Sequence, residues 1–223
     1  LLTVMGNHAF INYRDIDATA AYPVYQEMIN PDVDTDVVIN GYHFIGISYS
    51  DKNENFGDKT KWLDEQLKIA TKEDKNKPVF VFQHPHPTLT VYGSVNWGDI
   101  GVRSVLEKYP QVVDFSGHSH YPVNDPRSVW QNEYTAIGTG SLKYTELTVD
   151  GEQKIHPEAF EDCANFLIVE ADKDNNLRVI GVDCLAEEVI CEYYFKNPAD
   201  RSNREYTYDK QCARSLPPVF SGD

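Results

Sequence analysis

The chain has 223 residues, of which 35 are acidic and 20 are basic, and its formal net charge is −15. The electrostatic field of this negative charge repels polyanions at long range, which argues against a broad nucleic-acid-binding surface. A small anionic substrate beside bound cations is still allowed. Hydrophobic residues make up 41% of a globular composition, and no apolar run approaches the ~18–20 residues of a membrane span.

The first fifty residues contain short predicted elements separated by polar sequence. Residues 1–4 (LLTV) are an apolar run that predicts a strand. A helix is expected over 18–29. Residues 36–50 hold two β-branched or aromatic runs on either side of Asn40-Gly41, and this pattern predicts a β-hairpin.

The central part alternates between strands and helices. Residues 57–74 carry apolar side chains at helical spacing, with Asp58 as the expected N-cap, and 77–87 predict a buried strand that runs into a proline-containing loop. Residues 98–110 predict a helix, and 111–120 predict a strand followed by a loop. This order indicates a layered α/β domain. The residues of the first of these helices expected in the core are Trp62, Leu63 and Leu67.

After residue 128 the pattern becomes strand-rich, and Asp174-Asn175-Asn176 are expected to form a hairpin turn. Four cysteines lie in the last third, at spacings that do not fit a structural zinc site. A turn at 186–189 would bring Cys184 opposite Cys191. The sequence leaves the pairing open, and also the choice between disulfides and thiols, for Cys163, Cys184, Cys191 and Cys212.

Three predicted strands are followed by residues that commonly bind metal ions. Asn7 follows the first strand, His84 and His86 follow VFVFQ, and His118 and His120 follow VVDFSG. In open α/β sheets ligand sites gather beyond the carboxyl ends of the strands. We therefore expect Asn7, His84, His118 and His120 around one crevice. Imidazole nitrogens and an amide oxygen suit zinc, manganese or iron better than calcium.

These motifs, GNHA at 6–9, QHPHP at 83–87 and GHSH at 117–120, resemble in their order the calcineurin-like metallophosphoesterases. That superfamily includes purple acid phosphatases and cyclic-nucleotide phosphodiesterases, and the resemblance covers roughly residues 1–145. It implies an α/β (α+β) fold, a layered β-sandwich flanked by helices. It also implies an enzyme, a hydrolase with two metal ions that cleaves a small phosphomonoester or phosphodiester through a metal-activated hydroxide.

By this resemblance, Asn7, His84 and His118 bind one metal ion and His120 binds the other. His8 is then the catalytic histidine beside the phosphate. The choice of His84 over His86 rests on its position nearer to the strand end, and it stays open at this stage.

Two glycines precede these ligands, Gly6 before Asn7 and Gly117 before His118. We expect both to allow backbone angles that a side chain would obstruct.

The sequence departs from the family pattern in two places. Ala9 replaces an acidic residue, and the Asp-x-His and Gly-Asp-x-x-Asp motifs that supply the bridging carboxylate do not occur in the 223 residues. This chain alone is therefore expected to bind at most one metal ion weakly and to be inactive as a phosphatase. The alternative is a catalytically impaired binding module or pseudoenzyme of the same fold. A nuclease of this family is disfavoured by the charge of −15.

We expect residues 1–150 to be the C-terminal part of the catalytic domain, 151–196 a β-rich completion or extension, and 197–223 a linker toward a further domain. The chain opens on LLTVMGNH, without an initiator methionine or a signal peptide, which indicates a fragment or a processed product. Localisation and oligomeric state are open, with an extracellular or cell-surface location favoured over the cytoplasm.

Three further polar residues are assigned structural or surface roles. His43 lies in the middle of a predicted strand and His156 in a polar loop. Arg127 follows the GHSH loop and could reach a phosphate, but a surface ion pair is the favoured interpretation.

Overall fold

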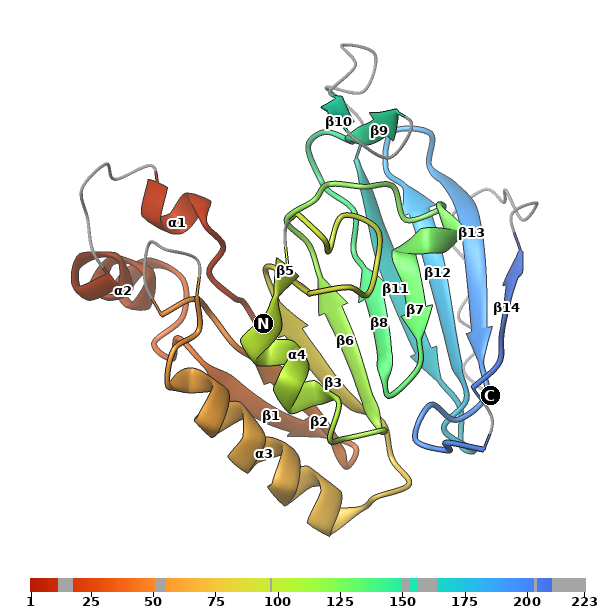
Figure 1. The fold of residues 1–223 in the computed structure, drawn as a ribbon, viewed down its shortest axis with the longest axis horizontal. Helices are drawn as coiled ribbons and strands as arrows, with labels where there is room; N and C mark the ends of the chain where they lie inside the picture. The colour runs from red at the N-terminus through yellow and green to blue at the C-terminus, as the bar shows by residue number, and fades with distance from the viewer. Residues whose placement is uncertain are drawn as a thin grey trace.

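A computed structural model describes residues 1–11, 18–50, 55–96, 98–149, 153–155, 164–202 and 204–209. His156, Cys163, Cys212 and most of the predicted linker therefore lie outside the described residues. The described chain is a mixed α/β structure with two main sheets and few helices, so the expected class is confirmed (Figure 1).

The larger sheet has six strands in the order β1-β2-β3-β6-β8-β7. The central four, β2, β3, β6 and β8, run parallel, so that their carboxyl ends meet at one edge of the sheet. The outer two pair antiparallel to their neighbours. The bounds are β1 (Thr35–Ile39), β2 (Tyr42–Gly46), β3 (Val79–Gln83), β6 (Val112–Ser116), β7 (Val129–Gln131) and β8 (Thr135–Gly138).

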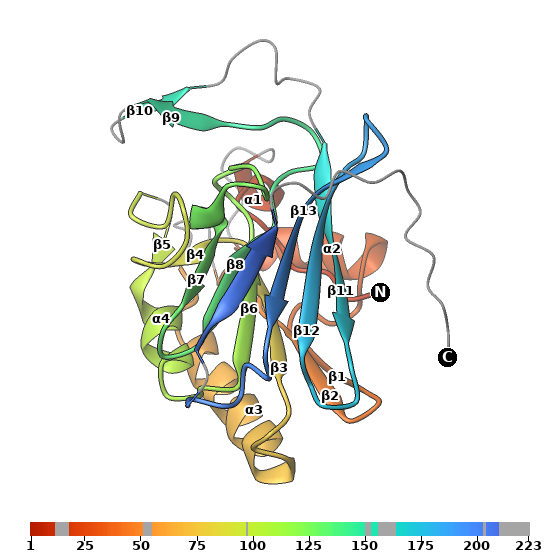
Figure 2. The same ribbon diagram turned by 90° about the vertical axis from the view of Figure 1, so that its right-hand side faces the viewer.

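The smaller sheet is antiparallel and packs on one face of the larger one (Figure 2). Its strands are β11 (Asn165–Ala171), β12 (Leu177–Asp183), β13 (Glu188–Phe195) and β14 (Tyr206–Asp209). The two sheets share one buried cluster, to which β6 contributes Val113 and Phe115, and β12 and β13 contribute Val179 and Tyr193. Residues on both sides of position 150 therefore build a common core.

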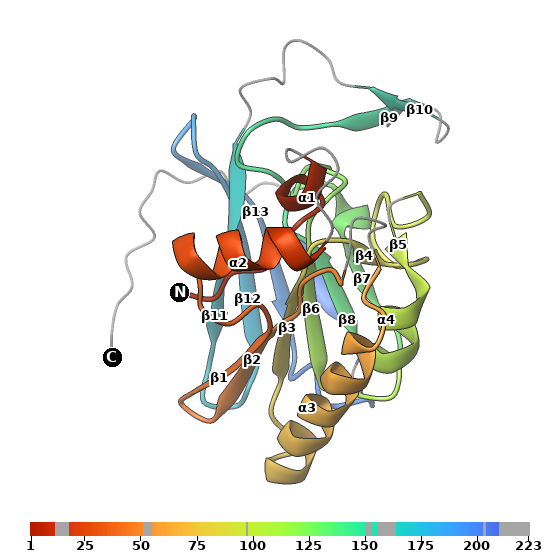
Figure 3. The same ribbon diagram turned by 90° about the vertical axis from the view of Figure 1, so that its left-hand side faces the viewer.

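Two helices cover the other face of the larger sheet (Figures 1 and 3). They are α3 (Lys59–Glu73) and α4 (Ile100–Leu106), and their apolar sides pack against the sheet through residues such as Leu63, Leu67 and Val102. The expected core residues Leu63 and Leu67 are fully buried, whereas Trp62 is partly buried.

The remaining described elements lie outside the two main sheets. They are α1 (His8–Ile11), α2 (Ala18–Met28), a 3-10 turn (Pro126–Ser128) and the strand pairs β4 (His86–Pro87) with β5 (Gly98–Asp99) and β9 (Leu147–Val149) with β10 (Gln153–Ile155).

The hairpin expected at Asn40-Gly41 is present. Asn40 and Gly41 have φ angles of +52° and +76°, the left-handed values that a two-residue hairpin turn requires. Asn175 has a φ of +62° in the turn between β11 and β12, which was also expected.

Two predicted elements at the ends of the chain need correction. Residues 1–4 do not form a strand, and the amide of the next residue, Met5, donates to the Ser48 hydroxyl at 2.9 Å. Within the stretch predicted as a linker, Tyr206–Asp209 form β14 and pair with β13. Alternate tyrosines of this strand, Tyr206 and Tyr208, pack against the cluster between the sheets.

Two local expectations are met only in part or not at all. Asp58 stands at the N-cap of α3, as expected, but its side chain accepts from Lys61 Nζ at 2.7 Å and makes no capping bond. Cys191 lies opposite Gly181 across the β12–β13 pair, not opposite Cys184, because β13 begins at Glu188.

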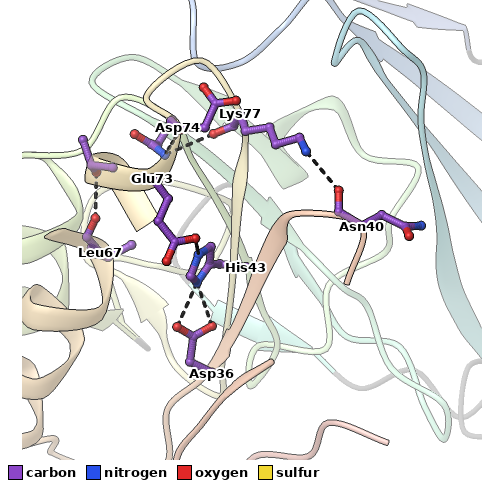
Figure 4. A network of polar contacts seen from close by, with 9 residues as sticks. Asp36, Asn40, His43, Leu67, Glu73, Asp74 and Lys77 are labelled. Carbon is purple, nitrogen blue, oxygen red and sulfur yellow. Dashed lines mark hydrogen bonds and ion pairs between the residues drawn. The ribbon is translucent and has the colours of Figure 1, made fainter. Parts of the chain in front are cut away.

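His43 joins three elements of the fold (Figure 4). It is 4% exposed on β2, its Nδ1 lies 2.9 Å from Asp36 Oδ2 on β1, and its Nε2 lies 3.1 Å from Glu73 Oε2 on α3. This histidine therefore has a structural role, as expected, because its ring bridges the carboxylates of Asp36 and Glu73.

None of the helices within the described ranges has the length and apolar character needed to cross a bilayer.

Candidate metal centre

Three of the predicted ligands, Asn7, His84 and His118, come together in the structure. Nε2 of His84 lies 2.9 Å from Oδ1 of Asn7 and 3.0 Å from Nδ1 of His118. They come from segments 77 and 34 residues apart in the chain. The order of the strands, not local sequence, therefore brings them together.

The contacts of His84 Nε2 fit a shared cation better than a hydrogen bond. One imidazole nitrogen offers either one proton or one lone pair, so it cannot make a full hydrogen bond to two neighbours at once. With metal–ligand bonds of about 2.0–2.2 Å, two donors at the tetrahedral angle lie roughly 3.3–3.6 Å apart. The two observed distances, 2.9 and 3.0 Å, are somewhat shorter, so a small outward shift of the side chains would seat an ion between them. The donor set of two imidazoles and one amide oxygen therefore fits a transition-metal ion.

Two of the three candidate ligands are positioned by the ends of neighbouring strands. His84 follows β3 directly, and the GHSH loop follows β6, its parallel neighbour. The Gly117 amide donates to the His84 carbonyl at 3.0 Å, which joins the two loops. Asn7 reaches the same place because the bond from Met5 to Ser48 holds the N-terminal segment just beyond the end of β2. The three side chains thus lie together at the carboxyl edge of the parallel strands.

The ring of His84 packs between Tyr49 and Gly6. The buried ring of Tyr49 meets it edge-on, with 6.0 Å between the ring centroids, and the backbone of Gly6 lies close to its Nδ1, Cε1 and Cγ atoms. Burial, followed by the nearby histidines, lowers the pKa of His84 to about 3. The imidazole is therefore neutral at physiological pH, which is the form that binds metal ions.

The backbone of the GHSH loop corrects the role expected for the glycines. Neither Gly6 nor Gly117 has a positive φ; instead His118 and His120 themselves have φ angles of +68° and +59°. Gly6 is needed because a side chain there would collide with His84, whereas a Cβ on Gly117 would meet nothing closer than 3.5 Å.

His120 points to a different environment from that of His118. Its ring packs against Tyr144, with 4.2 Å between centroids, and its carbonyl accepts from the Glu146 amide at 3.0 Å. His8 is exposed at the start of α1, and Ala9 packs against the core.

His86 occupies a position of its own, away from Asn7. It is 1% exposed, its Nδ1 lies 2.9 Å from the Ser116 hydroxyl, and its Nε2 lies 2.7 Å from the Ser119 hydroxyl. Both ring nitrogens are therefore engaged by serines. Between the two candidates that the sequence left open, only His84 is within hydrogen-bond distance of Asn7 and His118.

Arg127 is held in a surface ion pair, as expected. Its Nη2 lies 2.6 Å from Asp125 Oδ2, and its guanidinium lies 3.7 Å from the ring centroid of Tyr92. Tyr92 in turn stacks on Tyr121, the residue after His120, at 3.8 Å. This arrangement braces the end of the GHSH loop.

Some residues around the site were not foreseen from the sequence. Tyr49, Tyr144 and Glu146 have no motif that marks them, because loops far from the histidines in sequence bring them in. Among the described residues, no three histidine, cysteine, aspartate or glutamate side chains are placed to hold one metal ion. The third donor at the site is the amide of Asn7.

No protein-family model matches the chain, and none of the curated proteins is significantly similar to it.

Proposed function

We propose that Asn7, His84 and His118 bind one metal ion, and that His120 reaches toward a second, in a phosphoesterase of the metallophosphoesterase type. The observation that carries this proposal is the approach of Asn7 Oδ1 and His118 Nδ1 to a single nitrogen of His84, at 2.9 and 3.0 Å. The order of the motifs and their place at the carboxyl edge of a sheet packed between helices and a second sheet support it. We assign the fold to the same superfamily.

The reaction proposed is hydrolysis of a small phosphate ester. When bound, the metal ions supply Lewis acidity toward a phosphoryl oxygen and lower the pKa of water. His8 is exposed at the start of α1, next to the ligand Asn7, and is positioned to exchange a proton with the leaving oxygen or to stabilise phosphoryl charge. Zinc, manganese and iron all suit the donors present.

Titration of the 223-residue chain with Co²⁺, followed by visible absorption and calorimetry, tests the metal site. We expect one site, weakened at least tenfold in His84→Ala and in Asn7→Ala. His43→Gln is the matched control, because it changes a buried histidine that bridges other side chains away from the site. Equal Co²⁺ affinity in wild type and His84→Ala would remove the basis of the proposal.

The alternative function is a binding module that keeps the metal site without catalysis. Ala9, which packs into the core, and the absence of the two carboxylate motifs from the 223 residues favour it. A hydrolytic centre binds its phosphate product, so the zinc-loaded chain is titrated with orthophosphate. Binding that depends on zinc and weakens in His8→Ala supports the phosphoesterase. Zinc binding without phosphate binding supports the binding module.

Turnover of p-nitrophenyl phosphate is measured on the same samples. We expect none from this chain, because no residue matches the bridging carboxylate. Metal-dependent turnover would contradict that expectation and establish the hydrolase directly.

A further inference from the structure

We propose that His86 is a positioning residue, which holds the loop carrying His118 and His120 in the conformation that presents both imidazoles. This role rests on the metal centre proposed above. The imidazole of His86 spans two hydroxyls, Ser116 Oγ at 2.9 Å and Ser119 Oγ at 2.7 Å.

The two serines mark the ends of the segment to be held. Ser116 is the last residue of β6, and Ser119 stands between His118 and His120. The imidazole therefore ties the tip of the loop to the rigid end of a central strand. At the same tip the Ser119 amide donates to the Gly117 carbonyl at 2.8 Å, and the His120 carbonyl accepts from the Glu146 amide at 3.0 Å.

The loop conformation requires such a tie. His118 and His120 both have left-handed backbones, at +68° and +59°, which residues with a Cβ rarely adopt. Backbones of this kind persist only where the surroundings determine them. A bond to Ser119, the residue between them, fixes both at once.

The backbone of His86 is itself held in place. His86 and Pro87 form β4, which pairs with β5 (Gly98–Asp99). A Cβ at Gly98 would lie 2.2 Å from the Ser94 carbonyl oxygen and 2.7 Å from the Cα of Thr88, the residue after β4, so the chain around this pairing is closely packed. His86 is therefore a fixed anchor, and its two ring nitrogens each reach one of the two hydroxyls.

The experiment uses the full 223-residue chain and measures Co²⁺ affinity and visible absorption. His86→Leu is expected to weaken binding about 10–100-fold and to change the absorption spectrum, as loss of a residue that orients metal ligands does. His86→Gln, which can still bond to at least one serine, is expected to recover part of the affinity. His43→Leu is the matched control and should bind Co²⁺ like wild type.

A double-mutant cycle separates positioning from general destabilisation. Ser119→Ala alone should weaken binding as His86→Leu does, and the double variant should be no weaker than either single variant, because both changes break the same bond. Additive losses would overturn the proposal. Ser119→Ala removes only a hydroxyl, so it gives the result even if His86→Leu does not fold.

A second readout needs no metal. The Cα and Cβ chemical shifts of His118 and His120 report left-handed φ angles, and these are expected in wild type and lost in His86→Leu and Ser119→Ala. Unchanged shifts in both variants would overturn the positioning role. If wild type binds no Co²⁺, the metal centre fails, and the chemical shifts alone decide whether His86 orders the loop.

Discussion

A Cβ placed on Gly6 would lie 2.7 Å from Nδ1 of His84 and within 2.9 Å of two further ring atoms. Glycine at position 6 is therefore required by the approach of the ring, and the ring is the group that contacts both other ligands.

Gly6→Ala is expected to displace the His84 ring and weaken Co²⁺ binding at least tenfold. Overpacking of this kind destabilises a protein by about 1–3 kcal/mol. Gly117→Ala is the control, since its Cβ would meet Thr139 Oγ1 at an ordinary 3.5 Å. Calorimetric titration and urea unfolding of both variants check this. Equal Co²⁺ affinities in the two variants would contradict the steric argument.

The bridge made by His43 predicts a stability that depends on pH. Burial lowers its pKa, but the hydrogen bonds to Asp36 and Glu73 outweigh burial, and the pKa in the folded protein is raised above its usual 6.5. The protonated form is thus stabilised by folding. Its contribution is fully present below pH 6.5 and is lost as the pH rises through the folded pKa.

His43→Leu should therefore lose more stability at pH 5.5 than at pH 8.5. The expected loss at pH 5.5 is about 1.5–3 kcal/mol, the range for hydrogen bonds to charged groups. Urea unfolding at the two pH values measures it. The prediction fails if the difference between wild type and variant is the same at both values, or larger at pH 8.5.

In the smaller sheet the partly exposed Arg178 forms an ion pair with the buried carboxylate of Glu192. Glu192 is 0% exposed, and Arg178 donates to both of its carboxylate oxygens, with Nη2 at 2.7 Å and Nε at 3.1 Å. Arg178→Met leaves this carboxylate without its cation and should cost about 3–5 kcal/mol of unfolding free energy. The double variant Arg178→Met, Glu192→Gln should recover much of that loss. A double variant as unstable as the single one would show that the lost packing of Arg178 matters more than its charge.

The meeting of His84 and His118 could be predicted from the sequence, because both stand at or just after the end of an apolar run. Strand ends are local features, and the parallel order of β3 and β6 brings these two candidate ligands to the same edge. The hairpin at Asn40-Gly41 was predicted for a similar reason, since the two turn residues themselves adopt the left-handed conformation it needs.

Features that depend on distant partners could not be predicted in this way. The role of His86 depends on hydroxyls 30 and 33 residues away. The apolar residues 1–4 match a strand pattern, yet the Met5 amide bonds to a serine side chain instead of a neighbouring strand. β14 did carry a usable signal, because Tyr206 and Tyr208 alternate with polar residues and face the core.

The left-handed backbone angles of His118 and His120 lower the stability of the loop that carries them. A non-glycine residue held there costs roughly 1 kcal/mol or more, which glycine would avoid. Substitution of either histidine by glycine or asparagine, which adopt left-handed backbone angles more readily, would therefore stabilise the loop. This chain keeps histidine at both. It tolerates a less stable loop at the two positions to which the proposed function assigns metal-binding side chains.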